Sequence, residues 1–544
     1  MTEAKIGVFI CDCGGAMKNI DFPTIKGELD AIADVASVNL SSDLCLEEGR
    51  AKMLSCIKDE NIDRVVVAAC APQLKEHVFQ QVLRSAALNS YLMSMADIRE
   101  QCSWAHEGDV TTKACGLIKM AIGRARLLQP VEQKDLLVKQ EVLLVGGGFS
   151  AMSSAIQLSR LGLHTTLLVG DSALGVRSRE LEELLGLEVA PMTEAIDRDK
   201  NIEIVTSAEL VGMEGTAGNF AVRIRKGGEE FVQSFGAIIF ATGPRTEILP
   251  QDPGSKSSTR IVSQERLARW LRASSPQPRP RSVAFVFDSS DECSRLPTLV
   301  TLNNALAVKR SWGSEVYVFC KNVKVDSEGA EELYHQARER GVVFLKFEDS
   351  PGISIEDGLV RIEAKDVLLG QDATLTCDVV VAEEKVSPAA GTDDLRSLLN
   401  VRTDSRGFLQ DDNVHLYPVA SERKGIFFVG DCRGDLDAAR IVADVSSAVM
   451  GAHELLARGR ITVEAERVKV DPQKCRACLT CIRVCPHSAI QLVRIDSERE
   501  VAEISDLACD ACGICAGICP AKAIAFQGYS DEQILAQIEV LKAS

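Results

Sequence analysis

Two copies of one cysteine spacing near the end of the chain constrain its fold more than any other feature. Cys475 and Cys509 each begin a run, C-x2-C-x2-C-x3-C, that ends directly before proline. The first three thiolates of such a loop can hold three corners of a [4Fe–4S] cubane, and the fourth binds the cluster of the other copy. The sequence therefore predicts two clusters with crossed ligands. The first set is Cys475, Cys478, Cys481 and Cys519, and the second is Cys485, Cys509, Cys512 and Cys515.

Structural zinc is the alternative for these eight cysteines. Two zinc sites would need two separate four-cysteine sets, whereas here the fourth cysteine of each run stands apart, before Pro486 or Pro520. The spacing favours iron–sulfur clusters, which are redox centres. We therefore expect residues 461–544 to form a ferredoxin domain of the bacterial 2[4Fe–4S] type with a C-terminal helix, and the protein to transfer electrons.

Composition and charge narrow the class of protein. The 544 residues carry a net charge of −17, which disfavours a nucleic-acid partner because phosphate binding needs clustered Lys and Arg. The N-terminus lacks the order of a signal peptide, and no apolar run approaches the roughly 20 residues that span a bilayer. Nineteen cysteines in such a chain favour metal or redox chemistry over disulfides. We expect a cytoplasmic protein without direct membrane insertion, linked to any membrane only through a partner.

A glycine motif at Leu143–Ala151 predicts a nucleotide site. The run LLVGGGFSA joins a strand to a helix through Gly146-x-Gly148-x-x-Ala151. The first glycine makes the turn, and the second lets the backbone approach a pyrophosphate. The small third residue allows close packing, and the helix N-terminus faces the phosphates. Alone, the motif is equally compatible with a plain glycine turn.

Two later segments favour FAD as the nucleotide. Ala237–Gly243 reads AIIFATG and Gly425–Asp431 reads GIFFVGD, each a buried strand that ends in a small-residue turn. The order of the three strand ends resembles the FAD domain of two-dinucleotide-fold flavoproteins such as thioredoxin reductase, in which the last segment presents backbone and Asp to the ribityl chain. The second strand departs from the pattern, since Gly170 stands where an acidic residue binds the ribose and Asp171 follows one place late. The candidate FAD contacts are Gly146, Gly148, Phe149, Ser150, Ala151, Asp171, Arg177, Ala241, Thr242, Gly243, His415, Gly430, Asp431 and Ala439.

The segment that binds NAD(P)H in such flavoproteins lacks its motif here. Strand Val283–Phe287 leads into DSSDECSRLP, which contains no glycine. Without a glycine turn the backbone cannot cradle a second pyrophosphate. We therefore expect no direct reduction by a nicotinamide at this place.

The whole chain is expected to be α/β and multidomain. Near the N-terminus, Lys5–Ile10 and Arg64–Ala69 are predicted as buried strands and Phe22–Val35 as a helix. The parts before the ferredoxin domain are an N-terminal α/β domain (1–135), a thioredoxin-reductase-like FAD domain in two halves (136–275 and 386–460), and a degenerate nucleotide-binding-like subdomain (276–385).

Seven of the eleven other cysteines lie in the first 115 residues. Cys13 (or Cys11), Cys45, Cys70 and Cys102 each stand where a strand-like segment gives way to a turn. Because strand ends on one edge of an α/β sheet converge, four separated thiols there can hold one further cluster. Buried apolar cysteines are the alternative, and no local spacing motif decides between the two.

Three further segments resemble the heterodisulfide reductase family, in particular its FAD-carrying component. They read VVVAACAPQLKEHVFQ, DIREQCSWAH and GYSDEQILAQIEVL, and the likeness runs over almost the whole chain. The resemblance implies an FAD-carrying oxidoreductase subunit that passes electrons among [4Fe–4S] clusters and partner subunits of the B and C kind, in some complexes by electron bifurcation toward a ferredoxin. It implies a third cluster, held by Cys13, Cys45, Cys70 and Cys102, and a dimer within a larger complex. The substrate chemistry is expected on the partner subunits.

Three departures limit what the resemblance implies. Residues 185–235 contain no cysteine, so this is a short form without the ferredoxin insert of longer members. Of their cysteine cluster after the middle strand only Cys293 remains, and His415 stands in HLYPV where the family has Lys. A cation near a flavin tunes its potential, and His is largely neutral near pH 7, so we expect a different flavin potential.

Three other functions stay open. The first is the flavin subunit of a quinone-interacting membrane-associated oxidoreductase complex, which predicts a partner with transmembrane helices. The second is a non-catalytic scaffold and electron wire that has lost FAD, a hypothesis motivated by Gly170 and the missing nicotinamide motif. The third, a self-contained NAD(P)H oxidoreductase, predicts direct bleaching of the flavin by NADH. Flavin content separates the scaffold from the enzymes.

Overall fold

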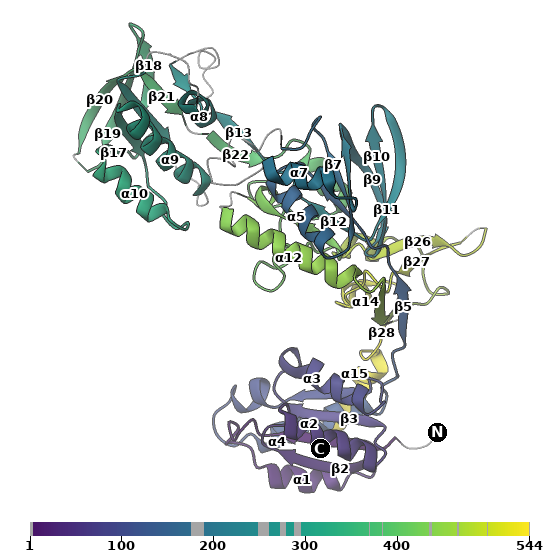
Figure 1. The fold of residues 1–544 in the computed structure, drawn as a ribbon. Coiled ribbons are helices and arrows are strands. Elements are labelled where there is room, and N and C mark those ends of the chain that lie inside the picture. The colour runs from purple at the N-terminus through teal and green to yellow at the C-terminus, as the bar shows by residue number, and fades with distance from the viewer. Residues whose placement is uncertain are drawn as a thin grey trace. The chain divides into compact units, whose positions relative to one another are not determined.

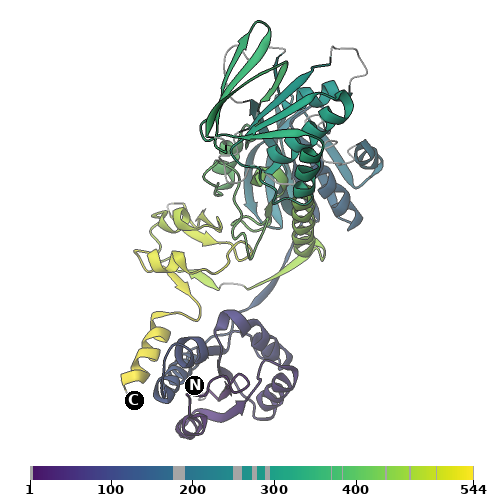
Figure 2. The same ribbon diagram turned by 90° about the vertical axis from the view of Figure 1, so that its left-hand side faces the viewer.

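The chain divides into two compact units. Figures 1 and 2 show their helices and strands. Residues 1–135 and 462–544 form the first unit, so the two terminal parts of the chain belong together, and residues 136–461 form the second. The two units are α/β structures, as expected from the sequence. The computed structural model describes residues 4–175, 190–248, 260–272, 279–287, 295–368, 370–382, 384–434, 438–464, 467–497 and 499–542.

A four-stranded parallel sheet forms the N-terminal part of the first unit. Its strands are β1 (Ile6–Cys11), β2 (Val35–Ser41), β3 (Arg64–Ala69) and β4 (Met93–Asp97), in the order β2-β1-β3-β4. Its helices are α1 (Phe22–Asp30), α2 (Glu47–Asp59), α3 (Pro72–Ser85), α4 (Thr111–Ala125) and the π-helix η1 (Arg99–Ser103). Met53 and Phe79 pack α2 and α3 on one face, and Ile25 and Ile118 pack α1 and α4 on the other. Burial on both faces explains why β1 and β3 read as continuous apolar runs.

The first helix is shorter than the sequence predicts. Asp21 caps it, since the Asp21 carboxylate accepts a hydrogen bond from the Thr24 amide at 3.2 Å. The helix ends at Asp30 rather than continuing to Val35, because Val35 already pairs with Ile6 of β1. Sheet pairing thus overrides helix propensity at this end.

The C-terminal part of the first unit builds one small motif twice. Strand β25 (Val468–Val470) pairs with β28 (Ile524–Phe526), and β26 (Ile490–Arg494) pairs with β27 (Glu500–Ile504), both antiparallel. Two short helices, α13 (Thr480–Val484) and α14 (Ile514–Ile518), lie within the two cysteine runs. Val468, Ile490 and Ile524 form the apolar core between the strands, together with buried cysteines.

Helix α15 (Asp531–Lys542) packs against α4 and closes the first unit. Gln533 Nε2 donates a hydrogen bond to the Leu127 carbonyl oxygen at 2.9 Å. The helices approach closely at Gly123, where a Cβ atom would lie 3.0 Å from the carbonyl oxygen of Ala536. The terminal helix therefore ties the ferredoxin part to the N-terminal sheet.

A five-stranded parallel sheet carries the nucleotide motif of the second unit. Its strands are β6 (Glu141–Val145), β7 (His164–Val169), β8 (Ile202–Thr206), β12 (Ala237–Phe240) and β23 (Ile426–Phe428), in the order β23-β12-β6-β7-β8. Helices α5 (Phe149–Arg160), α7 (Ala190–Arg198) and α12 (Ala438–Leu456) accompany it, and Met152, Ala448 and Ala452 share a core with the strands. An antiparallel sheet of β9 (Ala208–Thr216), β10 (Asn219–Lys226) and β11 (Glu229–Phe235) is inserted between β8 and β12.

A second parallel sheet is formed by residues that lie between β12 and β23 in the sequence. Its strands are β14 (Ile261–Val262), β21 (Val379–Ala382), β15 (Ser282–Phe287), β16 (Glu315–Cys320) and β17 (Val342–Lys346), in that order. Around it are helices α8 (Gln264–Arg272), α9 (Arg295–Trp312) and α10 (Ala330–Glu339) and the antiparallel strands β18 (Gly352–Glu356), β19 (Leu359–Asp366) and β20 (Gln371–Cys377). Strands β13 (Pro244–Ile248) and β22 (Glu384–Pro388) pair where the chain enters and leaves this subdomain. The remaining elements are β5 (Gln133–Leu137), α11 (Thr392–Leu399), the 3-10 helix η3 (Gly430–Arg433) and β24 (Arg460–Glu464).

Candidate flavin and iron–sulfur sites

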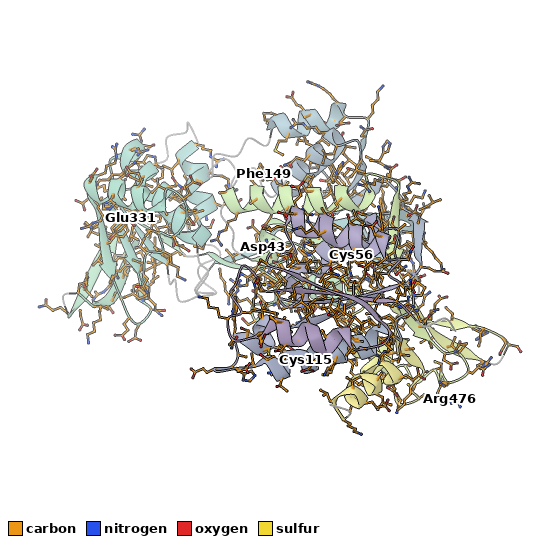
Figure 3. All side chains as sticks on the ribbon, turned by 90° about the horizontal axis from the view of Figure 1, so that it is seen from below. Asp43, Cys56, Cys115, Phe149, Glu331 and Arg476 are labelled. Atoms are coloured by element: carbon orange, nitrogen blue, oxygen red, sulfur yellow. The ribbon has the colours of Figure 1, made fainter. Side chains whose placement is uncertain are left out.

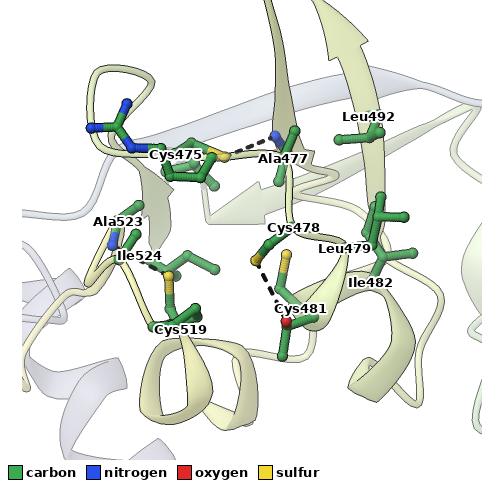
Figure 4. Close-up of a pocket in the computed structure, with 16 residues that line it drawn as sticks. Cys475, Ala477, Cys478, Leu479, Cys481, Ile482, Leu492, Cys519, Ala523 and Ile524 are labelled. Carbon is green, nitrogen blue, oxygen red and sulfur yellow. Dashed lines mark hydrogen bonds between the residues drawn. The ribbon is translucent and has the colours of Figure 1, made fainter.

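Four cysteines line a pocket in the ferredoxin part of the first unit (Figure 4). They are Cys475, Cys478, Cys481 and Cys519, the whole of the first predicted set. Cys519 comes from the second run, so the pocket joins residues of both runs. Leu492 and Ile524 are among the apolar residues that complete its wall. Four thiols around an apolar pocket are the donor set that a [4Fe–4S] cluster requires.

The two cysteine runs curl through matching left-handed residues. Ala477 (φ 49°) and Leu479 (φ 64°) in the first run correspond to Ala511 (φ 51°) and Gly513 (φ 79°) in the second. Three of the four are not glycine, and a left-handed conformation strains such residues. Strain of this kind gathers at functional sites, where the surrounding structure enforces it. Here the turns it produces allow three thiols of one short loop to face the same point.

Backbone amides point at the sulfurs of the two crossing cysteines. Ala489 N donates to Cys485 Sγ at 3.4 Å, and Ala523 N donates to Cys519 Sγ at 3.3 Å. Each donor follows its cysteine by four residues, so the two halves repeat one geometry. Hydrogen bonds to sulfur stabilise negative charge there and are among the factors that set the potential of a cluster.

The second predicted set is also brought together. The pKa of the Cys515 thiol is raised to about 11, first by burial and then by the charges of three neighbouring thiols, Cys509, Cys485 and Cys512. The four groups are therefore close enough to interact. Cys512 is exposed, as Cys478 is in the first set, whereas Cys515 is buried. Each set thus presents one sulfur at the protein surface.

Three of the four N-terminal candidates lie at one edge of the first sheet. Cys13, Cys45 and Cys70 follow the carboxyl ends of β1, β2 and β3. Cys13 interacts with Cys70, and Cys70 with Cys45. Cys11 joins them, since its Sγ lies 4.0 Å from Cys13 Sγ. The hydrogen bond between these two thiols lowers the pKa of Cys11 to about 6 and raises that of Cys13.

Cys102 lies in a different environment from the other three. It belongs to η1 and is buried in the core under α1 and α4. Its thiol donates to the Val110 carbonyl oxygen at 3.8 Å, and the charged groups that act on it are Lys113 and Asp97. The structure therefore gathers three predicted ligands and turns the fourth thiol toward Val110.

Arg99 is a residue of this edge that the spacing of the cysteines did not indicate. The positive charge of Arg99 acts on Cys13 and Cys70 and opposes the effect of burial on the pKa values of these thiols. Glu100 Oε1 lies 2.6 Å from Arg99 Nη2, and Glu100 Oε2 accepts a hydrogen bond from the Ala71 amide at 2.9 Å. A guanidinium beside thiols favours their deprotonated, metal-binding form. Only the fold brings it there, so no sequence pattern could have found it.

The nucleotide motif forms a tight cradle at the ends of three strands. Gly146 has φ +141°, and a Cβ atom there would lie 2.1 Å from the Ala241 carbonyl oxygen. Gly430 has φ +67°, and its Cβ atom would lie 2.3 Å from Ser150 Oγ. The ends of β6, β12 and β23 therefore meet with no room for side chains at these two positions. Helix α5 begins there, capped by Gly148, with its amide groups at its N-terminus.

A buried hydroxyl just after β12 tests whether a cofactor fits this cradle. Thr242 Oγ1 is buried and has no hydrogen-bond partner within the described part of the chain. A buried polar atom of this kind normally has a partner. Thr242 follows Ala241 directly and precedes Gly243, which has φ +69°. The unpaired hydroxyl beside a glycine cradle fits a bound polar group such as that of FAD.

The end of β7 is open to solvent where a ribose contact is expected. Gly170 is exposed and Asp171 is partly buried, with its carbonyl oxygen accepting a hydrogen bond from the Ser207 amide at 3.0 Å. Asp171 thus lies at the end of the strand, one place late, as the sequence indicates. Arg177, another candidate contact, lies outside the described residues.

A buried ion-pair network beside Gly430 was not predicted from the sequence. Arg433 Nε donates to Asp411 Oδ1 at 2.8 Å, and Arg433 Nη1 lies 2.5 Å from Asp444 Oδ2. Asp444 also accepts a hydrogen bond from the Gly430 amide at 3.3 Å. The side chains of Arg433, Asp411 and Asp444 are 16%, 3% and 12% exposed, respectively. The network fixes η3 to α12 and to the preceding loop.

The other candidate contacts occupy several environments. Phe149 and Ala151 lie in the first turn of α5, and Asp431 is partly buried in η3 (Figure 3 labels Phe149). Ala439 is exposed at the start of α12. His415 is exposed on the loop before Val419, where its amide donates to Asn413 Oδ1 at 2.9 Å.

The second parallel sheet contains the segment in which the sequence lacks a glycine motif. β15 ends at Phe287 and α9 begins at Arg295. The intervening residues, including Cys293, lie outside the described part of the chain.

Every described helix is too short or too polar to cross a lipid bilayer.

Comparisons with known proteins agree with this arrangement in the ferredoxin part. Residues 467–520 match the family model described as a 4Fe-4S dicluster domain. Among solved structures, the thioredoxin reductase of Lactococcus lactis aligns over 58% of this chain and 99% of its own, with a TM-score of 0.43 and 19% identity. The thioredoxin reductase of T. acidophilum aligns over 58% and 98%, with a TM-score of 0.40 and 18% identity.

Curated proteins resemble the chain over most of its length. A component of the H(2):CoB-CoM heterodisulfide,ferredoxin reductase of Methanothermobacter thermautotrophicus is 27% identical over 90% of this chain and 91% of its own. The corresponding iron-sulfur component of the CoB--CoM heterodisulfide reductase of Methanocaldococcus jannaschii gives the same identity and coverage. The resemblance seen in the sequence is thus confirmed, and the chain is a homologue of these heterodisulfide reductase components.

Proposed function

We propose that this chain is the FAD- and iron–sulfur-bearing electron-transfer subunit of a heterodisulfide-reductase-like oxidoreductase complex. The observation that carries the proposal is the presence, in one chain, of two gathered four-cysteine sets and a glycine cradle with a buried hydroxyl that has no partner among the described residues. Homology to the iron–sulfur components of heterodisulfide reductases supports it over 90% of the chain.

The roles of the residues follow from their positions. Gly146 and Gly430 let the backbone approach FAD, and Thr242 supplies a buried hydroxyl to it. When bound, FAD exchanges electrons as pairs or singly, and iron–sulfur clusters relay them. The two cysteine sets hold those clusters within apolar walls, which limit the access of water and thereby tune potential. Asp411 and Asp444 neutralise Arg433 and keep η3 in place.

Partner subunits of the heterodisulfide reductase kind supply the substrate chemistry in this proposal, and the chain is a dimer within the complex. Bifurcation of electron pairs toward a ferredoxin belongs to the same proposal. Four relatives carry ferredoxin in the names of their heterodisulfide reductases, which supports a ferredoxin as one partner. A third cluster, near Cys13, Cys45 and Cys70, is also proposed; the fourth ligand is Cys102 or Cys11.

An anaerobic reductive titration tests the electron-transfer function. FAD takes about two electrons and each cluster about one, so a chain with FAD and two clusters is expected to take about four, and one that also holds the third cluster about five. Adding NADH without partner subunits should leave the flavin absorbance unchanged. A chain that binds no FAD after gentle purification would be a scaffold, and bleaching by NADH alone would make it a self-contained oxidoreductase.

A further inference from the structure

The surroundings of the two exposed cysteines differ in charge. Lys474, Arg476 and Lys522 are exposed and lie within three residues of a first-set cysteine. Asp471 is the carboxylate of this loop, and its Oδ2 lies 3.4 Å from Lys474 Nζ. Arg476 also lines the pocket of the first set, at the surface of the ferredoxin part (Figure 3). The edge at Cys478 is therefore basic in a chain whose net charge is −17.

The second exposed cysteine has the opposite surroundings. Residues 505–519 contain Asp506 and Asp510 but no Lys or Arg. Ile514 and Ile518, on either side of the buried Cys515, are 47% and 45% exposed. Arg483 is also exposed and stands two residues from Cys481 of the first set and two from Cys485 of the second, so it adds a cation to both surroundings. The edge at Cys512 is thus acidic and apolar, and it offers no attraction to an acidic protein.

We propose that the Cys478 edge, with Lys474 and Arg476 beside it, is the docking surface for a small acidic protein that carries one electron at a time. The inference rests on the proposed electron-transfer function. In the exchange one electron moves between the carrier and the cluster held by the first set, and no covalent bond forms or breaks. Charge complementarity selects the approach, because the acidic remainder of the chain repels such a carrier and the basic edge attracts it.

Stopped-flow electron transfer between the full-length holoprotein and a chemically reduced, acidic bacterial 2[4Fe–4S] ferredoxin tests this surface. The second-order rate is expected to fall at least tenfold as ionic strength rises from about 0.05 to about 0.5 M, because salt screens the attraction. At low salt, Lys474→Glu with Arg476→Glu should slow the transfer at least tenfold and flatten its salt dependence. Lys474→Gln with Arg476→Gln should fall between this variant and the wild type.

The control is a matched charge reversal elsewhere in the same domain. Arg494→Glu with Arg499→Glu changes the net charge equally on the hairpin of β26 and β27, and its rate should stay within about twofold of the wild type. Equal loss in both charge-reversed proteins, or no loss in either, would overturn the docking surface. So would binding to phosphatidylserine vesicles that needs Lys474 and Arg476 while transfer rates stay unchanged. Iron content distinguishes failure of the proposed function from failure of the docking surface. A wild type without iron contradicts the proposed function, whereas unchanged transfer rates in the Lys474 and Arg476 variants at full iron content contradict only the docking surface.

Discussion

At the residue scale, the close approach of three strand ends leaves no space for a side chain at Gly146 or Gly430. The two positions differ in what they would meet: the backbone oxygen of Ala241 lies 2.1 Å from a Cβ at Gly146, and the hydroxyl of Ser150 lies 2.3 Å from one at Gly430. A serine side chain can rotate away, whereas the backbone carbonyl of Ala241 cannot. Gly146 is therefore the stricter requirement for a nucleotide in the cradle.

Gly146→Ala is expected to lower the FAD content of the purified protein at least tenfold, because its methyl group pushes β12 away from β6. Gly162→Ala is the matched control: Gly162 also has positive φ (+83°), but nothing lies within 4 Å of its Cβ position. It should cost about 1–3 kcal/mol of stability through backbone strain and keep its FAD. The FAD content of each variant is measured by fluorescence after the flavin is released by heat. Full FAD content in Gly146→Ala would show that the cradle is not the FAD site.

Arg433→Met is expected to destabilise the protein by about 3–5 kcal/mol, because it leaves the buried carboxylates of Asp411 and Asp444 without a cation. Arg406→Met, which breaks the more exposed pair with Asp404, should cost about 0–1 kcal/mol. Urea unfolding measures both changes. Adding Asp444→Asn to Arg433→Met should restore part of the loss, and a double variant less stable than Arg433→Met would argue against the network.

At the scale of elements, single ion pairs and helix contacts add to the apolar cores of the first unit. Arg126, at the end of α4, makes two hydrogen bonds to the carboxylate of Asp34, at 2.6 and 2.7 Å, just before β2. These hydrogen bonds lower the pKa of Asp34 below its ordinary value, against the opposing effect of burial. The pair links a helix to the sheet edge across 92 residues of sequence.

The Asp34 pair predicts how stability changes with pH. Because the pKa of Asp34 is lower in the folded chain, its contribution is present above the ordinary Asp pKa of about 3.9 and is lost as pH falls through the lowered value. Asp34→Asn should therefore reduce stability near pH 7 by ~1 kcal/mol or less, since Arg126 is partly exposed. Unfolding curves of both proteins should converge below pH 4, and a difference that persists there would mean that the charge is not responsible.

Helix α15 offers a second test, with two glycines of α4 as a matched pair. A Cβ at Gly123 meets the Ala536 carbonyl oxygen at 3.0 Å, whereas one at Gly116 meets only the Leu541 side chain at 3.6 Å. Gly116→Ala should stabilise the protein by about 0.5–1 kcal/mol through helix propensity. Gly123→Ala should lack that gain and speed amide hydrogen exchange in α15. Equal stabilisation by both changes would show that α15 does not pack closely at Gly123.

The sequence predicted those parts of the fold and of the site that depend on local spacing. The cysteine runs specify their own turns, so the gathering of Cys475, Cys478, Cys481 and Cys519 could be predicted. Parallel strands bring their carboxyl ends to one edge, so Cys13, Cys45 and Cys70 could be expected to meet. The direction of the Cys102 thiol could not, because it depends on a π-helix and on Val110.

Long-range charge contacts were beyond sequence reasoning for a similar reason. The Arg433 network joins side chains from three segments, and neither Asp411 nor Asp444 stands at a spacing that marks a partner. Arg99 acts on Cys13 and Cys70 only because the sheet brings its edge residues together. The helix expected to reach Val35 ended at Asp30 because strand pairing competes for the same residues.

At the scale of the whole molecule, the chain crosses between its two units twice. The cysteine sets and the N-terminal cysteines belong to the first unit, whereas the glycine cradle belongs to the second. One polypeptide thus carries the sites for a two-electron cofactor and for one-electron centres. This division of sites supports the proposed role of passing electrons between a flavin and partner subunits.

The content of iron and FAD per chain, measured by elemental analysis and native mass spectrometry on anaerobically purified protein, tests the central claim most directly. The account predicts one FAD with about eight iron atoms in the C-terminal sets, and about twelve in all when the N-terminal cysteines hold a cluster. Cys70→Ser should then remove about four iron atoms and leave the FAD. A chain that carries zinc in place of iron, or that holds no FAD, would contradict the account.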